Sequence, residues 1–512
     1  MSDPDDLFPS TSSETTETTS TFAHRIRWER VAVAVIGSYY LAKLLYFALS
    51  VAPGVPPDET THLELIRLYA RTRLFVEDSP ASYQWGLVTH VPYFYHLLFG
   101  KLLTLNLFGI EDYRFLRLAN VGLGMLTFGA CYGLARETSA GVLTRLLFLV
   151  MITNTLMFTF ISAAISYDNL VNLLAVISLW MLTRFLRTGD PASLLGCLAA
   201  MGLGSITKTS FLPIVPTIAL VILWLRRGTL RSDAGSILKA LKSRSPAAWI
   251  LSVLVAISFS GALLLYGGNL FRFQKPVPAC DEVLGLDQCM QNRIFARNRI
   301  LALYRTNEID LRQAMLESGS IAHSGDRDHL LRLIENERRY KSNPTPPLNR
   351  FDYLLLAWDR ALKPTMFGIQ AHHSMLKSAN QTVAYEIILV AAILLTVRLI
   401  RRSDQDWLVL SSVSGVYILF LVCFYNYAGY VQSHAPFLGV QGRYLFPVLA
   451  PVFLISSEFV LRPFRGQWKL LPVVVIATVF VAGELPYFRS HASPPWFSPA
   501  ATRIEKTLEG LS

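Results

Sequence analysis

Long, nearly uninterrupted apolar runs recur along the whole chain and constrain its fold more than any other feature. They cover Val31–Ala52, Leu116–Leu134, Val142–Ile165, Leu170–Thr183, Trp249–Leu265, Ile387–Leu399, Trp407–Phe424, Tyr444–Val460 and Leu470–Ala482. A helix needs roughly 20 such residues to cross the hydrocarbon of a bilayer, and the shorter runs reach that length with their flanks. Only 16% of the residues are charged, against about 25% in a typical soluble domain. The runs predict an all-α polytopic membrane protein.

The formal net charge of +11 does not point to nucleic acid, because the basic residues gather in short loops between the apolar runs. These loops hold Arg184 and Arg187, residues 226–244, residues 398–402 and residues 462–469. An excess of Lys and Arg marks cytoplasmic loops. Arg25, Arg27 and Arg30 stand directly before the first run, so the N-terminus is predicted to be cytoplasmic. Residues 1–30, which begin with a Ser/Thr-rich stretch, are predicted to be a disordered tail.

The apolar segment 88–108 decides the topology. If it crossed the membrane, Arg184 and Arg187 would fall outside. If it lies in the outer interface, every major basic cluster falls inside. Its two histidines, its proline and Lys101 suit a helix at headgroup level. We therefore predict a juxtamembrane helix here rather than a transmembrane helix.

This choice gives about eleven transmembrane helices of roughly the length that a bilayer requires. The expected spans are 31–52, 115–135, 142–164, 170–187, 193–209, 210–226, 247–268, 383–399, 407–425, 440–461 and 469–487. The first module covers 31–268 and has an outer loop at 53–113. Residues 269–380 carry apolar residues at helical spacing and are predicted to form a small extracytoplasmic helical subdomain. Residues 381–490 hold the last spans, and 491–512 form an outer tail.

Two cysteines, Cys280 and Cys289, lie in the predicted outer segment. Disulfides persist in oxidising compartments, so the two cysteines could form a short-loop disulfide if this segment is extracytoplasmic. Two free thiols are the alternative. No CxxC or HxxxH pattern accompanies the pair, which argues against a zinc site.

Ionisable residues near membrane depth are costly and are functional candidates by default. Asp58 and Glu59 follow the first span and begin an amphipathic helix that also carries His62. Arg114 and Arg117 open the second span, on the side where positive charge is unexpected. The plainer alternatives are acids that complement a helix dipole and arginines that reach lipid headgroups.

Two more sites complete this set. Asp168 lies in the tight loop between two spans, and Lys208 enters from the same side. The segment Gln441-Gly442-Arg443-Tyr444 opens the tenth span. Asp168 could be only a helix N-cap, and Arg443 only an interfacial arginine. Together, however, carboxylates that can act as a base and cations that can hold phosphate fall on one face of the membrane.

These motifs resemble those of the GT-C glycosyltransferases, which include protein O-mannosyltransferases, oligosaccharyltransferases and the lipid A aminoarabinose transferase. Asp58-Glu59, followed by the segment from His90 through Tyr93 to Tyr95, resembles their first outer loop. The Arg-led second span, the outer Asp168 and Lys208 follow in similar order. Gln441-Gly442-Arg443-Tyr444 is most similar to an uncharacterised bacterial branch. The similarity covers roughly residues 31–270 and 380–490.

The resemblance implies transfer of a sugar from a polyprenyl-phosphate-linked donor to a glycan, lipid or protein acceptor outside the bacterial inner membrane. It implies that Asp58, with Glu59 beside it, acts as base, and that Asp168 is the acid of the second outer loop. Arg114, Arg117, Lys208 and Arg443 would bind the donor phosphate. His62, His90, Tyr93, Gln441 and Tyr444 would line the acceptor cavity. No cofactor is expected, and a divalent metal is not favoured because Asp168 has no second acid near it.

Two other classes remain open at this stage. A polysaccharide polymerase or ligase would also use lipid-linked substrates, but it would not require Asp58-Glu59 directly after the first span. A lipid or polysaccharide transporter would bury charges near the membrane midplane and usually shows an internal repeat. Nucleic acid is not an expected partner, whereas the bilayer is.

Overall fold

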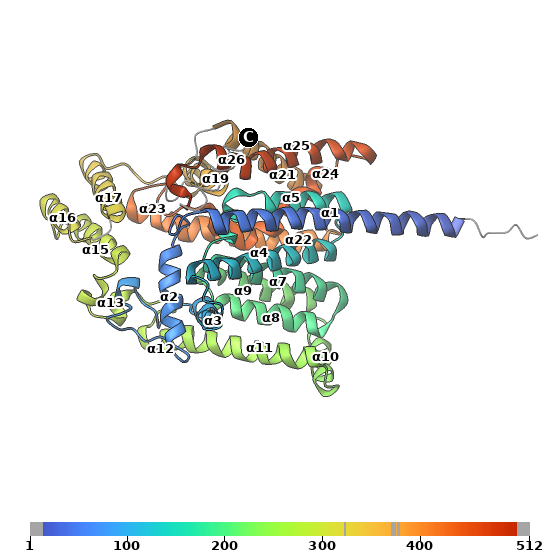
Figure 1. Cartoon of the computed structure of the whole chain (residues 1–512), viewed down its shortest axis with the longest axis horizontal. Coiled ribbons are helices and arrows are strands. Elements are labelled where there is room, and N and C mark those ends of the chain that lie inside the picture. Colours follow the sequence, from blue (N-terminus) through green and yellow to red (C-terminus); the bar gives the residue numbers. More distant parts are fainter. Residues whose placement is uncertain (1–13, 322–323, 370–374, 376–378, 499–512) are drawn as a thin grey trace, which may run out of the picture.

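The computed structural model describes residues 14–321, 324–369, 375 and 379–498. Within these residues the chain is helical, and its one pairing of extended segments is the isolated antiparallel bridge between Val51 and Phe497. The long helices run nearly parallel to one another in a bundle (Figure 1). The prediction of an all-α polytopic protein is confirmed.

The first half of the chain supplies α1 (Glu14–Ser50), α2 (Glu59–Arg71), α3 (Phe94–Leu103), α4 (Asp112–Glu137), α5 (Val142–Thr153), α6 (Leu156–Ser162), α7 (Tyr167–Thr188), α8 (Pro191–Ser205), α9 (Ile214–Arg226), α10 (Leu230–Lys242), α11 (Pro246–Ala262) and α12 (Gly268–Phe273). The short helices α13 (Cys280–Val283), α14 (Leu286–Cys289), α15 (Arg293–Arg305), α16 (Leu311–Ser318) and α17 (Ser324–Ser342) follow. The rest are α18 (Arg350–Asp352), α19 (Asp359–Phe367), α21 (Ala379–Leu399), α22 (Gln405–Phe420), α23 (Tyr427–Ser433), α24 (Phe446–Leu461), α25 (Leu470–Ala482) and α26 (Leu485–His491).

Among the described residues, nine helices are long and apolar enough to cross a membrane, or up to ten if a bent pair counts as one span. The predicted count of about eleven is therefore not confirmed. The expected third span, 142–164, is broken into α5 and α6, which meet at 69°. The expected fifth span, 193–209, is α8, whose 15 residues rise only about 22 Å.

A lysine from α1 stabilises the break between α5 and α6. Lys43 Nζ lies 2.6 Å from the carbonyl oxygen of Thr153, 2.8 Å from Asn154 Oδ1 and 3.0 Å from Glu484 Oε2. All three protons of the ammonium thus have acceptors, although the group is fully buried. The interruption of α5 frees a carbonyl that the ammonium group then satisfies.

The segment 88–108 does not form a span. Its helix, α3, has 10 residues and a length of about 15 Å, half of the hydrocarbon thickness. It packs against α2, which runs across the ends of the long helices (Figure 1). We call this end of the bundle the α2 end and the opposite end, which carries α10, the α10 end. At the other terminus of the first span, α1 begins at Glu14, so the structure describes residues 14–30, part of the predicted tail, as helical. Residues 1–13 lie outside the described residues.

The predicted outer segment 269–380 divides between two cores. Residues from α15, α16 and α17, such as Ile300, Leu330 and Ile334, form a small core of their own. Residues 350–367 instead join the main core of the bundle through Tyr353 and Trp358. The predicted subdomain over 269–380 stays a prediction, and its described residues contribute to both cores. The disulfide between Cys280 and Cys289 is present.

Candidate active site

The first acid of the motif stands where the chain leaves α1 and enters α2. Asp58 is the N-cap residue of α2 and adopts a left-handed backbone conformation, with φ 59°. Only Gly, Asn and Asp visit this region readily. Pro56 and Pro57 directly precede it, in the non-helical segment between the end of α1 at Ser50 and the start of α2, where they do not have to supply the backbone N–H that a helix interior requires.

Four charged side chains from distant segments meet at this point, at the α2 end. Arg443 Nη2 lies 2.6 Å from Asp58 Oδ2, and Arg443 Nη1 lies 3.8 Å from Asp168 Oδ2. Lys208 Nζ lies 2.5 Å from the other oxygen of Asp168. We call these four residues the charge cluster. Two carboxylates and two cations alternate in it, so its formal charge is zero.

The members of the charge cluster differ in exposure. The side chain of Asp58 is 32% exposed, whereas that of Arg443 is 6% exposed, and Asp168 and Lys208 are also mostly buried. Asp168 Oδ2 and Arg443 Nη1 have no hydrogen-bond partner among the described residues. A buried polar atom that lacks a partner costs about 1–3 kcal/mol. The cluster therefore leaves room for an additional polar group between a buried acid and a buried cation.

The backbone around Arg443 is held close to α19. The backbone N–H of Gly442 donates to Thr365 Oγ1 at 2.7 Å, and a Cβ at Gly442 would lie 2.6 Å from the Cα of Met366. Glycine is thus required by the close approach of two backbones. Arg443 Nε also donates to Gln441 Oε1 at 2.6 Å, which orients the guanidinium toward Asp58.

Two tyrosine rings line the cation side of the cluster. Lys208 Nζ lies 4.3 Å from the ring centre of Tyr167 and 5.4 Å from that of Tyr444. Arg443 also faces the Tyr444 ring, at 5.8 Å. Contacts of this kind attract a cation to the aromatic face, so the two rings stabilise the positions of Lys208 and Arg443.

Glu59 and Arg117 lie in a separate and closed ion pair. Arg117 donates to both carboxylate oxygens of Glu59, at 2.8 and 2.7 Å, and both side chains are 1% exposed. Arg117 also donates to the carbonyl oxygens of Ala48, Val51 and Ala52 near the end of α1. The structure therefore does not place Glu59 as a second catalytic acid or Arg117 as a ligand of the donor phosphate.

Three further candidates lie away from the charge cluster. Arg114 is exposed and pairs with Glu111 at 3.4 Å. His90 Nδ1 lies 2.7 Å from Oδ1 of Asn269, which is at the start of α12. Tyr93 packs beside α2 and α3, where its neighbours include Tyr69 and Val88. These contacts assign Arg114, His90 and Tyr93 to the frame of the α2 end rather than to the cluster.

His62 does lie beside the cluster, together with a histidine that the sequence motifs did not single out. Its Nδ1 lies 3.0 Å from His96 Nε2, and its ring meets Tyr167 edge-on at 4.3 Å. Burial lowers the pKa of His62 to about 3 and lowers the pKa of His96 well below its usual value. Both imidazoles are therefore neutral at physiological pH. The sequence signal for His96 was only its place among the aromatics of 88–108.

Ca²⁺ takes six to eight oxygen ligands, and Mg²⁺ takes six, usually several waters with one or two carboxylates that are free to bind it. In the described part of the chain, no three His, Cys, Asp or Glu side chains gather in a metal-binding arrangement. Asp58 and Asp168 are engaged with Arg443 and Lys208 instead. These residues do not fit a resident divalent metal, and metal independence stays a prediction.

The bundle that carries this site has the fold of the GT-C membrane glycosyltransferases. The apo oligosaccharyltransferase of Archaeoglobus fulgidus superposes with a TM-score of 0.50 at 12% sequence identity, over 92% of this chain and 56% of that one. Residues 97–263 match the family model described as dolichyl-phosphate-mannose-protein mannosyltransferase. The predicted resemblance to GT-C proteins is thereby confirmed.

Other solved structures resemble the chain more loosely. AglB from Archaeoglobus fulgidus, in complex with an inhibitory peptide and a dolichol-phosphate, gives a TM-score of 0.48 at 12% identity, over 94% of this chain and 59% of that one. ArnT from Cupriavidus metallidurans, bound to undecaprenyl phosphate, gives 0.34 at 16% identity, over 85% and 78%. The chain thus spans less than three fifths of the two oligosaccharyltransferase structures. The curated proteins contain no significant match.

Proposed function

We propose that this chain is a membrane glycosyltransferase that moves a sugar from a polyprenyl-phosphate-linked donor to a glycan, lipid or protein acceptor. The observation that carries the proposal is the charge cluster, in which the partly exposed Asp58 contacts the buried Arg443, with the mostly buried Lys208 nearby. A carboxylate that substrate can reach suits a general base. Buried cations beside it suit the negative charge of a departing phosphate.

The reaction that fits this arrangement is a single displacement at the anomeric carbon. Asp58 takes the proton of the acceptor hydroxyl while the acceptor oxygen bonds to that carbon. The bond between the carbon and the phosphate oxygen breaks at the same time, and the polyprenyl phosphate leaves with the electron pair. Arg443 and Lys208 stabilise the charge that develops on this leaving oxygen.

The ion pair between Arg443 and Asp58 gives the donor a role in activating the base. In the structure, Nη2 of Arg443 binds Asp58 and Nε binds Gln441, whereas Nη1, which lies 3.8 Å from Asp168, has no hydrogen-bond partner among the described residues. A donor phosphate that takes up this free nitrogen competes with Asp58 for the same cation. Weakening of the pair raises the basicity of the carboxylate, so the base becomes effective once the donor is bound.

The proposed location is the cytoplasmic membrane of a bacterium, with the N-terminus in the cytoplasm and the α2 end outside. The basic loops support this orientation, because the loop between α9 and α11 and the loop after α24 share the α10 end. The acceptor is then a molecule that reaches the outer surface.

Complementation tests the proposal. The gene is deleted in its host, and wild type, Asp58→Asn or Arg443→Ala is supplied at matched membrane levels. We expect both variants to lose an envelope glycan and to accumulate the polyprenyl-linked sugar. Asp287→Asn is the matched control, since Asp287 is exposed on the short helix α14 and should behave as wild type. Full activity of Asp58→Asn would overturn the assignment of the base.

A further inference from the structure

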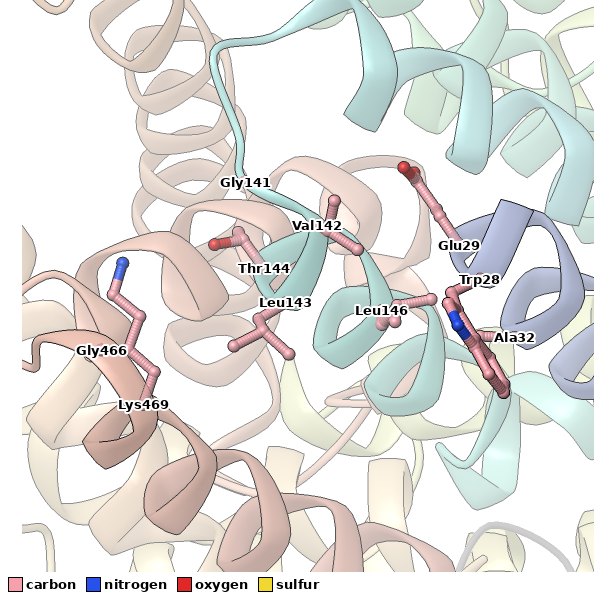
Figure 2. Close-up of a pocket in the computed structure, with 10 residues that line it drawn as sticks. All are labelled: Trp28, Glu29, Ala32, Gly141, Val142, Leu143, Thr144, Leu146, Gly466 and Lys469. Carbon is pink, nitrogen blue, oxygen red and sulfur yellow. The ribbon is translucent and has the colours of Figure 1, made fainter. Parts of the chain in front are cut away.

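A second feature, at the other end of the bundle, is not used by the proposed reaction. A cavity of about 730 Å³ opens there between α1, α5 and the turn before α25. Figure 2 shows its lining: Trp28, Glu29, Ala32, Gly141, Val142, Leu143, Thr144, Leu146, Gly466 and Lys469. The candidate span of α1 begins at Trp28 and α5 begins at Val142, so the cavity lies at the membrane surface of the α10 end.

The wall of the cavity is mostly apolar. Ala32, Val142, Leu143 and Leu146 provide aliphatic surface, and the exposed indole of Trp28 stands at the edge. Tryptophan gathers at the boundary between lipid headgroups and hydrocarbon. An apolar wall that begins at the boundary between headgroups and hydrocarbon contacts a lipid acyl chain rather than water.

The polar rim of the cavity has one uncompensated positive charge. Glu29 accepts from Arg145 at 2.7 Å through both of its oxygens, so its charge is neutralised. Thr144 donates to Glu458. Lys469 also lines the cavity, but it has no ion-pair partner in the part of the chain that the structure describes. The cavity therefore offers a cation to a ligand whose tail is apolar.

We propose that this cavity binds one anionic phospholipid of the membrane leaflet at the α10 end. The ammonium of Lys469 holds the phosphate of the headgroup, and an acyl chain lies along Ala32, Leu143 and Leu146. Basic pockets between membrane helices on the cytoplasmic side are favourable places for anionic headgroups. The assignment is independent of the proposed transferase function, because it shares no residue with the charge cluster.

Two variants test the site. Lys469→Gln removes the charge, and Arg465→Gln is its matched control, since Arg465 is exposed in the same turn and does not line the cavity. Gly141→Leu fills the cavity. The backbone of Gly141 is extended, with φ −70°, and a Cβ there meets no atom within 4 Å, so this variant should fold.

The measurement is native mass spectrometry of the full chain, released from nanodiscs with equal amounts of phosphatidylglycerol and phosphatidylcholine. We expect wild type and Arg465→Gln to retain one phosphatidylglycerol. We expect Lys469→Gln to bind it about five-fold more weakly, which is the worth of one lysine near a membrane surface, and Gly141→Leu to lose it. Equal retention of the two lipids would overturn the proposal. So would unchanged binding by Lys469→Gln, an equal loss in Arg465→Gln, or displacement of the lipid by millimolar inorganic phosphate.

Discussion

Asp58 and Glu59 are neighbours in the sequence, but their carboxylates lie in two different kinds of ion pair. The carboxylate of Glu59 is 1% exposed and takes two hydrogen bonds from Arg117, and it also accepts from the backbone N–H of Ile165. The carboxylate of Asp58 is 32% exposed and faces Arg443, one nitrogen of which has no hydrogen-bond partner among the described residues.

The difference separates structural charge from functional charge. A buried pair whose hydrogen bonds are all made gains nothing from a ligand, and its loss leaves an unpaired charge in the interior. A partly exposed pair with an unsatisfied nitrogen still has hydrogen-bonding capacity for a substrate. Arg117 thus fastens the start of α4 to the start of α2 through Glu59 and to the end of α1 through backbone carbonyls, whereas Asp58 and Arg443 form the pair that the proposed reaction uses. The predictions below test this division.

The largest effect is expected from breaking the buried ion pair between Glu59 and Arg117. Glu59→Gln leaves the buried Arg117 without a counter-charge, which costs about 3–5 kcal/mol when one partner of a buried pair is removed. We expect little folded protein by size-exclusion chromatography and a lowered thermal midpoint in detergent. The double variant Glu59→Leu with Arg117→Met should recover part of the loss. A stable Glu59→Gln protein would show that the pair is not structural.

A smaller effect is expected from changing the geometry of the ion pair between Asp58 and Arg443 while the positive charge at position 443 is kept. Arg443→Lys retains a cation but loses the planar fork that faces both Asp58 and Asp168. We expect transfer to fall about 10²-fold, as for the loss of one preorganised donor, with unchanged folding. Rates measured with a purified donor lipid would check this, and wild-type turnover by Arg443→Lys would contradict it.

The neutral pair of His62 and His96 predicts that the stability of the folded protein decreases in acid. The pKa of His62 is lowered from 6.5 to about 3 in the folded protein, so between these values the unfolded state binds more protons than the folded state. The free energy of unfolding therefore falls as the pH drops from about 6.5 towards 3, by up to about 1.4 kcal/mol per pH unit for each such imidazole. Thermal midpoints between pH 7.5 and 4.5 would measure the slope.

The control for this slope is His96→Asn, which removes one of the two imidazoles and should flatten the dependence. If its midpoint fell with pH as steeply as that of wild type, the acid sensitivity would have to arise elsewhere. Between pH 7 and 8 both proteins should show the same dependence, because neither histidine titrates there.

The smallest expected effect is that of metal removal. Arg443 and Lys208 already provide the positive charges that Asp58 and Asp168 face, so a chelator should leave transfer unchanged within about two-fold. Activity that falls with EDTA and returns with Mg²⁺ or Mn²⁺ would contradict this prediction and would assign the two carboxylates a metal-binding role.

Much of the architecture followed from apolar runs and loop charge. Most spans lie where the runs predicted them, and segment 88–108 is excluded as a span by its short α3. The break in the third span could not be read from its composition, because Thr153 and Asn154 interrupt the run only through a tertiary contact with Lys43. The sequence also did not show that residues 269–380 contribute to two cores. Helical periodicity identifies the apolar face of a helix but not the core against which that face packs.

The candidate site was predicted in part. Asp58, Asp168, Lys208 and Arg443 were each chosen as a costly charge near membrane depth, and they do lie together. Whether Asp58 or Glu59 is buried in a fully hydrogen-bonded ion pair depends on the partner that each carboxylate meets in the folded protein. Glu59 meets the partner that buries it. That partner, Arg117, is remote in sequence, so no local pattern distinguishes Glu59 from Asp58.

The bond between Lys43 and Glu484 has a consequence for how the protein is made. Lys43 belongs to α1 and Glu484 follows α25, so the lysine leaves the ribosome, and can enter the bilayer, before its counter-ion has been synthesised. An unpaired lysine in a membrane helix is costly. The helix α1 therefore reaches its final position only after α25 and Glu484 have been made, and chains truncated before Glu484 become targets for membrane proteolysis.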